Sequence, residues 1–125
     1  MVAEITDWKK WHAENGETFD ETYHFLYSFA FYDVETEDSI YDWFEEKGYQ
    51  GGGPTWAGVI FGLVMQHEPR NIKNIDLDDE GDGLVVSSNN FELLQRVLQW
   101  TTDTKYNEDL RLKAIEIAEK HDQME

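Results

Sequence analysis

The sequence has no cysteine, few basic residues and no long apolar segment. Without cysteine, the chain cannot form disulfides, thiolate metal sites or a cysteine nucleophile. Lys and Arg number 10 against 27 Asp and Glu, so the formal net charge is −17. A field of this sign repels phosphate backbones and anionic membrane surfaces, and we therefore expect no direct binding to nucleic acid or to a membrane.

The longest apolar run, Trp56–Met65, is too short to cross a bilayer. It is interrupted by Gly58 and Gly62, whereas a spanning helix needs about 20 apolar residues. The N-terminal sequence MVAEITDWKK also lacks the basic stretch and apolar core of a secretory signal. These absences lead us to expect a cytoplasmic protein.

Apolar residues are nevertheless abundant enough for a folded core. Hydrophobic and aromatic residues make up 40% and 14% of the 125 positions, which is typical of a globular protein. This length fits one domain, residues 1–125. The acidity has two interpretations: it serves solubility alone, or it speeds encounter with a cationic protein. Nucleases are often cationic because their substrate is polyanionic.

Hydrophobic periodicity predicts the secondary structure. Two tryptophans three positions apart indicate a short helix over residues 6–15. Aromatic residues at alternate positions predict a strand over residues 21–34, and its length suggests a central place in the sheet or a bulge near Ser28 and Ala30. The alternating residues are Tyr23, Phe25, Tyr27, Phe29 and Phe31.

The rest of the chain alternates helical and extended patterns. In order, it is predicted to form a helix from Thr36 or Ser39 to Lys47, a buried helix Trp56–Gln66 capped by Thr55, strands Ile72–Leu77 and Leu84–Ser88, a helix capped by Asn89 or Asn90, and a final helix Asn107–His121. The acidic, glycine-containing segment between the two strands has hairpin chemistry. We therefore predict an α+β fold, with a small antiparallel sheet of about three strands packed against several helices.

The sequence contains no complete motif for metal binding or catalysis. If the acidic turn is aligned with a calcium-binding loop that starts at Asp76, position 12 is Ser87 in place of the required bidentate carboxylate. The glycines 51–53 precede a helix, but Pro54 and the absence of Gly-Lys-Ser/Thr argue against a phosphate loop. The four histidines, which form no zinc-binding pattern, are His12, His24, His67 and His121. No nucleophile elbow is present, and we predict no enzyme activity, no metal and no cofactor.

The central part of the chain, residues 40–100, resembles immunity family fifty-one of bacterial polymorphic toxin systems. The similarity rests on GYQGGGPTW at residues 48–56, the apolar helix that follows, and the later hairpin with its acidic turn and closing Ser87-Ser88. The resemblance implies an immunity protein of a contact-dependent growth inhibition system, which binds the toxin domain encoded beside it and is monomeric in the complex. Acidity and the lack of catalytic motifs agree with this expectation.

We expect the partner to be a cationic toxin, namely a nuclease whose active site is masked by acidic side chains. The segment 33–46 holds seven acidic residues and no basic one, so it is the first candidate surface. The predicted contact residues are Asp38, Tyr41, Asp42, Glu45, Glu46, Tyr49, Asp78, Asp79 and Glu80. The alternative function is a small-molecule or peptide-binding domain with a pocket near the glycine turn and Trp56.

Overall fold

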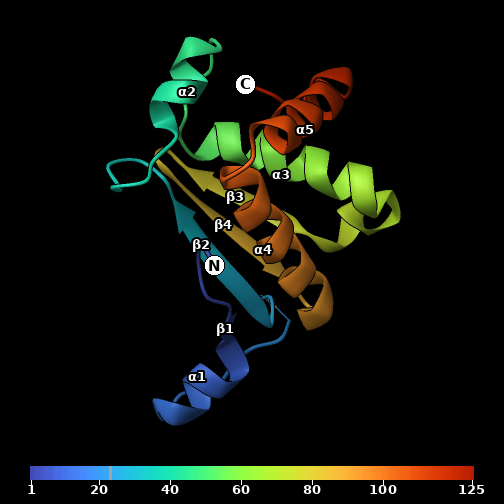
Figure 1. Ribbon diagram of the computed structural model, residues 1–125. Helices are drawn as coiled ribbons and strands as arrows, with labels where there is room; N and C mark the ends of the chain where they lie inside the picture. The colour runs from blue at the N-terminus through green and yellow to red at the C-terminus, as the bar shows by residue number, and fades with distance from the viewer. Residues whose placement is uncertain (23) are drawn as a thin grey trace.

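The computed structural model describes residues 1–22 and 24–125. Tyr23, which the sequence placed in the first strand, lies outside the described residues. The elements, shown in Figure 1, are in chain order β1 (Thr6–Asp7), α1 (Trp8–Glu14), β2 (Tyr27–Tyr32), α2 (Tyr41–Glu46), α3 (Gly53–His67), the 3-10 helix η1 (Pro69–Asn74), β3 (Asp76–Glu80), β4 (Gly83–Ser88), α4 (Phe91–Lys105) and α5 (Glu108–Lys120).

The predicted α+β class is confirmed, but the sheet has four strands where about three were expected. The strands pair antiparallel in the order β1-β2-β4-β3. The additional strand, β1, includes Thr6, which was predicted to begin a helix. Thr6 pairs instead with Ser28, and the helix starts after Asp7, whose side chain accepts a hydrogen bond from the Lys10 amide.

β2 is central, as predicted, but it is shorter than the predicted strand and has no bulge. Its ladder with β4 is continuous from Tyr27 opposite Ser88 to Tyr32 opposite Gly83. Of the two alternatives that the length of the predicted strand suggested, the central position is confirmed and the bulge near Ser28 and Ala30 is not present. The alternation itself holds, since Phe29 and Phe31 are buried while Ala30 and Tyr32 are exposed.

The β3–β4 hairpin starts later and turns more tightly than predicted. Residues 69–74 form η1, because Pro69 fixes its own φ and cannot extend α3. Asp78, Asp79 and Glu80, which were predicted to lie in the turn, belong to the strand β3. The turn is reduced to Gly81, with a φ of +68°, and Asp82.

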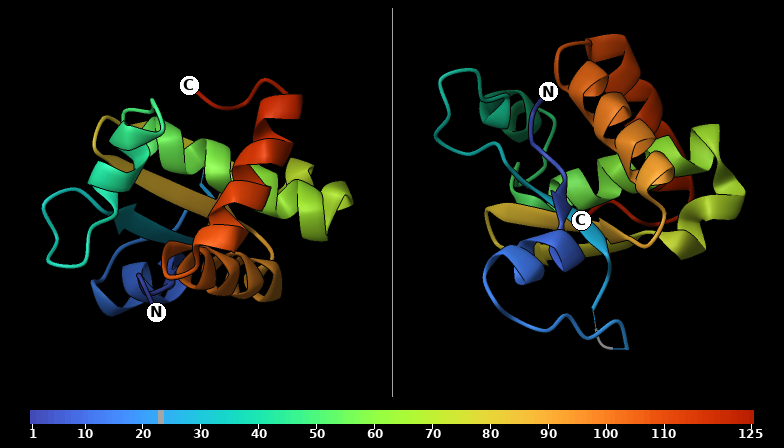
Figure 2. Two further views of the ribbon diagram at one scale, coloured as in Figure 1. Left: turned by 45° about the horizontal axis from the view of Figure 1, so that its top comes forward. Right: turned by 90° about the horizontal axis from the view of Figure 1, so that it is seen from below.

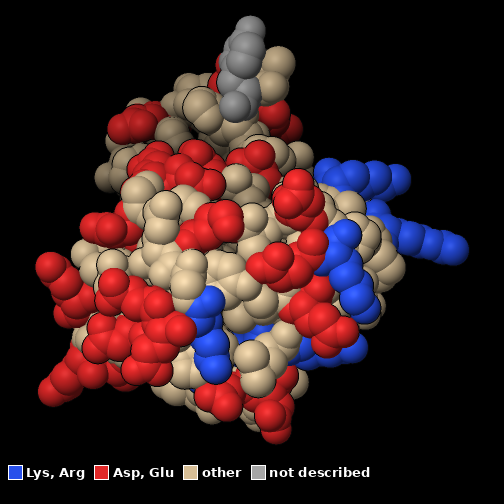
Figure 3. Space-filling view, turned by 90° about the horizontal axis from the view of Figure 1, so that it is seen from above, with Lys and Arg blue, Asp and Glu red and all other residues tan. Residues whose placement is uncertain are grey.

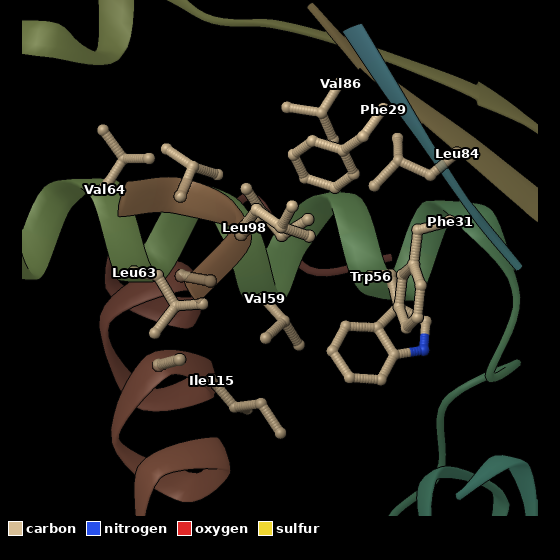
Figure 4. Close-up of a cluster of buried hydrophobic side chains, with 14 of the residues drawn as sticks. Phe29, Phe31, Trp56, Val59, Leu63, Val64, Leu84, Val86, Leu98 and Ile115 are labelled. Carbon is tan, nitrogen blue, oxygen red and sulfur yellow. The ribbon is translucent and has the colours of Figure 1, made fainter. Parts of the chain in front are cut away.

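The core lies between the sheet and the helices α3, α4 and α5. Figure 4 shows Val59, Leu63 and Val64 of α3 among side chains from the sheet, α4 and α5. Trp56 is 1% exposed and meets Phe31 edge to face at 4.7 Å between ring centroids. α3 is the buried helix that its apolar sequence predicted, although it begins one turn early, after Gly52, with Pro54 in its first turn.

The two faces of the sheet are covered unequally. The right-hand view of Figure 2 shows α4 and α5 on one side of the sheet and α1 on the other. α1 covers only one end of that second face, and none of its residues is buried. Among the described residues, no helix combines the length and apolar character needed to cross a membrane.

Candidate partner-binding surfaces

The glycine turn explains how two acidic elements come together. A Cβ at Gly51 would lie 2.7 Å from the Tyr41 ring of α2, and a Cβ at Gly53 would lie 2.1 Å from the Gly83 carbonyl oxygen. The Gly53 amide also donates a hydrogen bond of 2.7 Å to the Gly81 carbonyl. Only glycine permits this approach. The turn therefore places α2 beside the tip of the β3–β4 hairpin.

α2 has only six residues and is held by a buried ion-pair network. The Lys105 Nζ lies 2.7 Å from Asp33 Oδ1 and 3.0 Å from Asp38 Oδ1, and both the Lys105 and Asp33 side chains are buried. Asp33 Oδ2 accepts a hydrogen bond of 2.9 Å from the Ile40 amide, at the start of the helix. Tyr106 donates to Asp38 Oδ2 at 2.6 Å. The end of α4 thus fixes the segment that leads into α2.

These contacts change the ionisation of Asp38 and Lys105. The hydrogen bonds from Tyr106 and Lys105 lower the pKa of Asp38 to about 2. Burial lowers the pKa of Lys105, but its hydrogen bonds to Asp33 and Asp38 outweigh that effect and leave the pKa raised. Asp38, a predicted partner contact, therefore serves first as an internal link.

Trp43 fixes the other side of α2 against α5. Its indole donates to Glu108 at 2.7 Å, and the Arg111 guanidinium lies 4.4 Å from the centroid of the ring. Arg111 is buried, which lowers its pKa, and it donates to the Thr104 and Lys105 carbonyls. The short helix is thereby fixed on this side as well. Phe44 is buried in the core, and Asp42, Glu45 and Glu46 are the exposed residues of the helix.

The outward side of α2 is uniformly acidic. Asp42, Glu45 and Glu46 are exposed, and none of them forms an ion pair among the described residues. In the face shown in Figure 3, acidic side chains cover much of the left half, whereas most lysine and arginine side chains lie toward the right. Three of the predicted contact residues therefore form one unpaired anionic surface.

Tyr41 and Tyr49, two of the predicted partner contacts, pack against or hydrogen-bond to other residues of the chain. Tyr41 is half-buried and its ring packs on Gly51. The Tyr49 hydroxyl donates to Glu119 on α5, and burial together with this hydrogen bond raises the pKa of Tyr49 to about 12. Both tyrosines therefore contact other parts of the chain.

Strand periodicity divides the three predicted hairpin residues between two faces. Asp78 pairs with Val85 and Glu80 with Gly83, so both carboxylates project from the sparsely covered face of the sheet. Asp79 pairs with Leu84 and projects from the helical face, where it lines a small hollow beside α3. The structure therefore separates Asp79 from the other two.

The sequence did not predict that Asp76 and the aromatic residues of α1 form a surface together with Asp78 on the sparsely covered face. Asp76 pairs with Ser87 and projects beside Asp78. A hollow of about 380 Å³ lies here, between the strands and an aromatic wall that includes Trp8 and Phe25. The available signal was the period-two spacing of Asp76, Asp78 and Glu80, which marks one face of a strand.

A small hollow lies near the glycine turn, where the alternative function would need a pocket. Trp56 is buried in the core, and the hollow beside Pro54 and Gly58 measures about 250 Å³. Among the described residues, no three His, Asp or Glu side chains are grouped to hold a metal ion.

Comparison with known proteins gives a family match over most of the chain. The family model described as Immunity protein 51 matches residues 18–120, which span everything from the loop before β2 to the end of α5. No curated protein and no solved structure matches the chain. Because the match covers most of the 125 residues, the chain belongs to the Immunity protein 51 family.

Proposed function

We propose that this chain neutralises the toxin domain encoded beside it by masking a cationic active-site cleft, and that the toxin is a nuclease. Membership of an immunity family supports a toxin partner. The observation that supports the finer proposal is that α2 and the tip of the β3–β4 hairpin both contact the glycine turn. The chain acts in the cytoplasm as a monomer, by binding and without turnover.

The physical basis of the proposal is electrostatic. Asp42, Glu45 and Glu46 have no internal cation, so their charges remain available to a partner. A net charge of −17 accelerates encounter with a cationic domain, and carboxylates can occupy the positions that bind substrate phosphates. Because α2 is already fixed by Asp33 and Trp43, little conformational entropy is lost on binding.

The proposal is tested with the variant Asp42→Asn/Glu45→Gln/Glu46→Gln and the purified neighbouring toxin domain. Association at low salt is expected to slow by about tenfold, because the long-range attraction is reduced. The matched control, Glu92→Gln/Asp103→Asn/Glu116→Gln, removes the same charge from the exposed sides of α4 and α5. Stopped-flow kinetics at several salt concentrations measure both variants.

Equal slowing by the two triple variants would show that net charge acts without a specific surface. Unchanged association in the α2 variant, together with unchanged protection of cells that express the toxin, would remove α2 from the interface. If the unmodified chain fails to bind the toxin domain, the immunity function itself is refuted for this pair.

A further inference from the structure

The sparsely covered face of the sheet carries a second surface, which we call the sheet groove. Its floor consists of the outward side chains of β2 and β4, with Val85 flanked by Ser28 and Ser87. Asp76 and Asp78 of β3 form one side. The opposite side is aromatic and is built from α1 and the loop that follows it. The hollow measures about 380 Å³, enough for one or two side chains of a partner.

The aromatic wall is preformed. The Trp8 indole donates a hydrogen bond of 2.7 Å to Ser28 Oγ, which ties α1 to the sheet. The rings continue outward in edge-to-face contacts, with centroid distances of 5.6 Å from Trp8 to Trp11 and 5.4 Å from His12 to Phe19. Leu26 after the loop accepts from the Trp8 amide at 2.9 Å. A partner therefore meets an ordered wall and does not have to order it.

Apart from the imidazoles of His12 and His24, the titratable side chains that line the sheet groove are carboxylates. Asp76 and Asp78 are the carboxylates that line it, and no lysine or arginine of the described chain does so. Both are exposed, and neither forms an ion pair among the described residues. Glu80 extends the acidic row along the same side of β3. Aromatic rings facing carboxylates across a hollow are a suitable environment for a guanidinium or ammonium group.

We propose that the sheet groove docks an arginine- or lysine-bearing segment of the toxin, as a contact additional to α2. This inference rests on the proposed function and names the chemistry of the occupant. The cation would lie between the aromatic wall and Asp76 and Asp78, with its alkyl stem on Val85. A second copy of this chain is a poor occupant, because two molecules of net charge −17 repel each other.

Substituting Val85 with a positive or a negative residue tests whether the group that binds in the sheet groove is positively charged. Val85 is half-buried at the floor of the sheet groove, so Val85→Lys and Val85→Glu introduce chains of similar bulk at its centre. With the neighbouring toxin domain as the probe, Val85→Lys is expected to weaken binding by about tenfold or more, because like charges meet in a partly desolvated site. Val85→Glu is expected to weaken it less than threefold or to strengthen it. Circular dichroism and melting temperature establish that both variants fold.

A second pair tests the carboxylates without altering the floor. Asp76→Asn/Asp78→Asn is expected to raise the Kd by about tenfold, and the control Asp103→Asn/Glu116→Gln, which removes two charges elsewhere, by less than threefold. Equal weakening by Val85→Lys and Val85→Glu would overturn the proposal of a cationic occupant. No effect of any groove variant on a toxin that the unmodified chain binds would refute the sheet groove and leave the immunity function standing.

The oligomeric state of the isolated chain is a separate test of the proposal. Sedimentation equilibrium is expected to give a monomer at all concentrations tested. A dimer that both Val85 variants dissociate would show that the groove binds a second copy, and would overturn the proposal. Failure of the unmodified chain to bind the toxin domain would refute the proposed function, whatever the groove variants do.

Discussion

The helical face of the sheet and its sparsely covered face differ in almost every physical respect. On the helical face, Phe29, Phe31 and Val86 are buried beneath α3 and α4. On the other, Ala30 and Tyr32 of the same strand are exposed, beside the carboxylates of β3. Alternate residues of single strands thus face a dry core and an acidic, partly aromatic groove.

This difference separates stability from recognition. Removal of apolar area from water on the helical face is the main source of folding free energy. The exposed acidic positions add little to stability and repel one another. Substitutions on the helical face should therefore change the free energy of unfolding. Substitutions on the sparsely covered face should change the affinity for a toxin.

The largest expected effect contrasts two tryptophans. Trp56→Ala should reduce the free energy of unfolding by about 3–5 kcal/mol, because it leaves a cavity in the core. Trp11→Ala should reduce it by less than about 1 kcal/mol, because Trp11 lies on α1 and is 42% exposed. Urea denaturation measures both. Similar losses in the two variants would contradict the proposed division.

The next largest effect on the free energy of unfolding is expected from the buried ion pair between Lys105 and Asp33, which holds the segment that leads into α2. Lys105→Met should cost about 3 kcal/mol, because the buried carboxylate of Asp33 is left without its cation. The exposed pair of Lys120 with Glu116 supplies the control, and Lys120→Met should cost less than about 1 kcal/mol. Chemical denaturation at pH 7 compares them. If Lys105→Met proved neutral, α2 would have to be held by other contacts.

The contact between α3 and α5 should show a smaller loss. A Cβ at Gly62 would lie 2.1 Å from the Ala114 carbonyl oxygen, so the helices must separate in Gly62→Ala. Alanine favours a helix by about 1 kcal/mol, but the overpacking should outweigh this and leave a net cost of about 1–2 kcal/mol. Gln66→Ala, at an exposed position of the same helix, should change stability by less than about 0.5 kcal/mol. A stabilised Gly62→Ala variant would show that the helices are not in such close contact.

The smallest effect concerns the pH dependence of Asp38. The pKa of this residue, about 2 in the folded chain, lies below its ordinary value of 3.8. Its contribution to stability is therefore complete above about pH 4 and is lost as the pH falls through 2. Tyr106→Phe removes the strongest hydrogen bond and should raise the pKa of Asp38 toward its ordinary value. Carboxyl titration by NMR measures the change, and an unaltered pKa would show that Tyr106 does not stabilise the carboxylate.

The sequence predicted what local patterns determine. Alternation located β2, and the apolar run located α3. Of the two predicted caps of α4, Asn89 and Asn90, the structure has Asn90, and α5 is capped by Asn107, where the final helix was predicted to begin. β1 was missed because two residues carry no periodic signal, and it exists only through its pairing with β2. The second half of β3, from Asp78 to Glu80, was predicted to belong to the turn because aspartate has a low strand propensity, but pairing with β4 overrides that preference.

The candidate surfaces were predictable only in part. Asp42, Glu45 and Glu46 followed from helical spacing, and they do face outward. The internal roles of Asp38 and Tyr49 depend on Tyr106 and Glu119, which are 68 and 70 positions away in the chain, and no local pattern encodes such contacts. The sheet groove likewise required the tertiary structure to bring α1 beside β3.

Hydrogen exchange of the chain alone and in complex with the neighbouring toxin domain tests the central claim most directly. Backbone amides of α2 and of the edge strand β3 should exchange more slowly in the complex, while those on the exposed sides of α4 and α5 should remain unchanged. Protection confined to α4 and α5, with α2 and β3 exchanging as in the free chain, would contradict the assignment of the acidic surfaces to toxin binding.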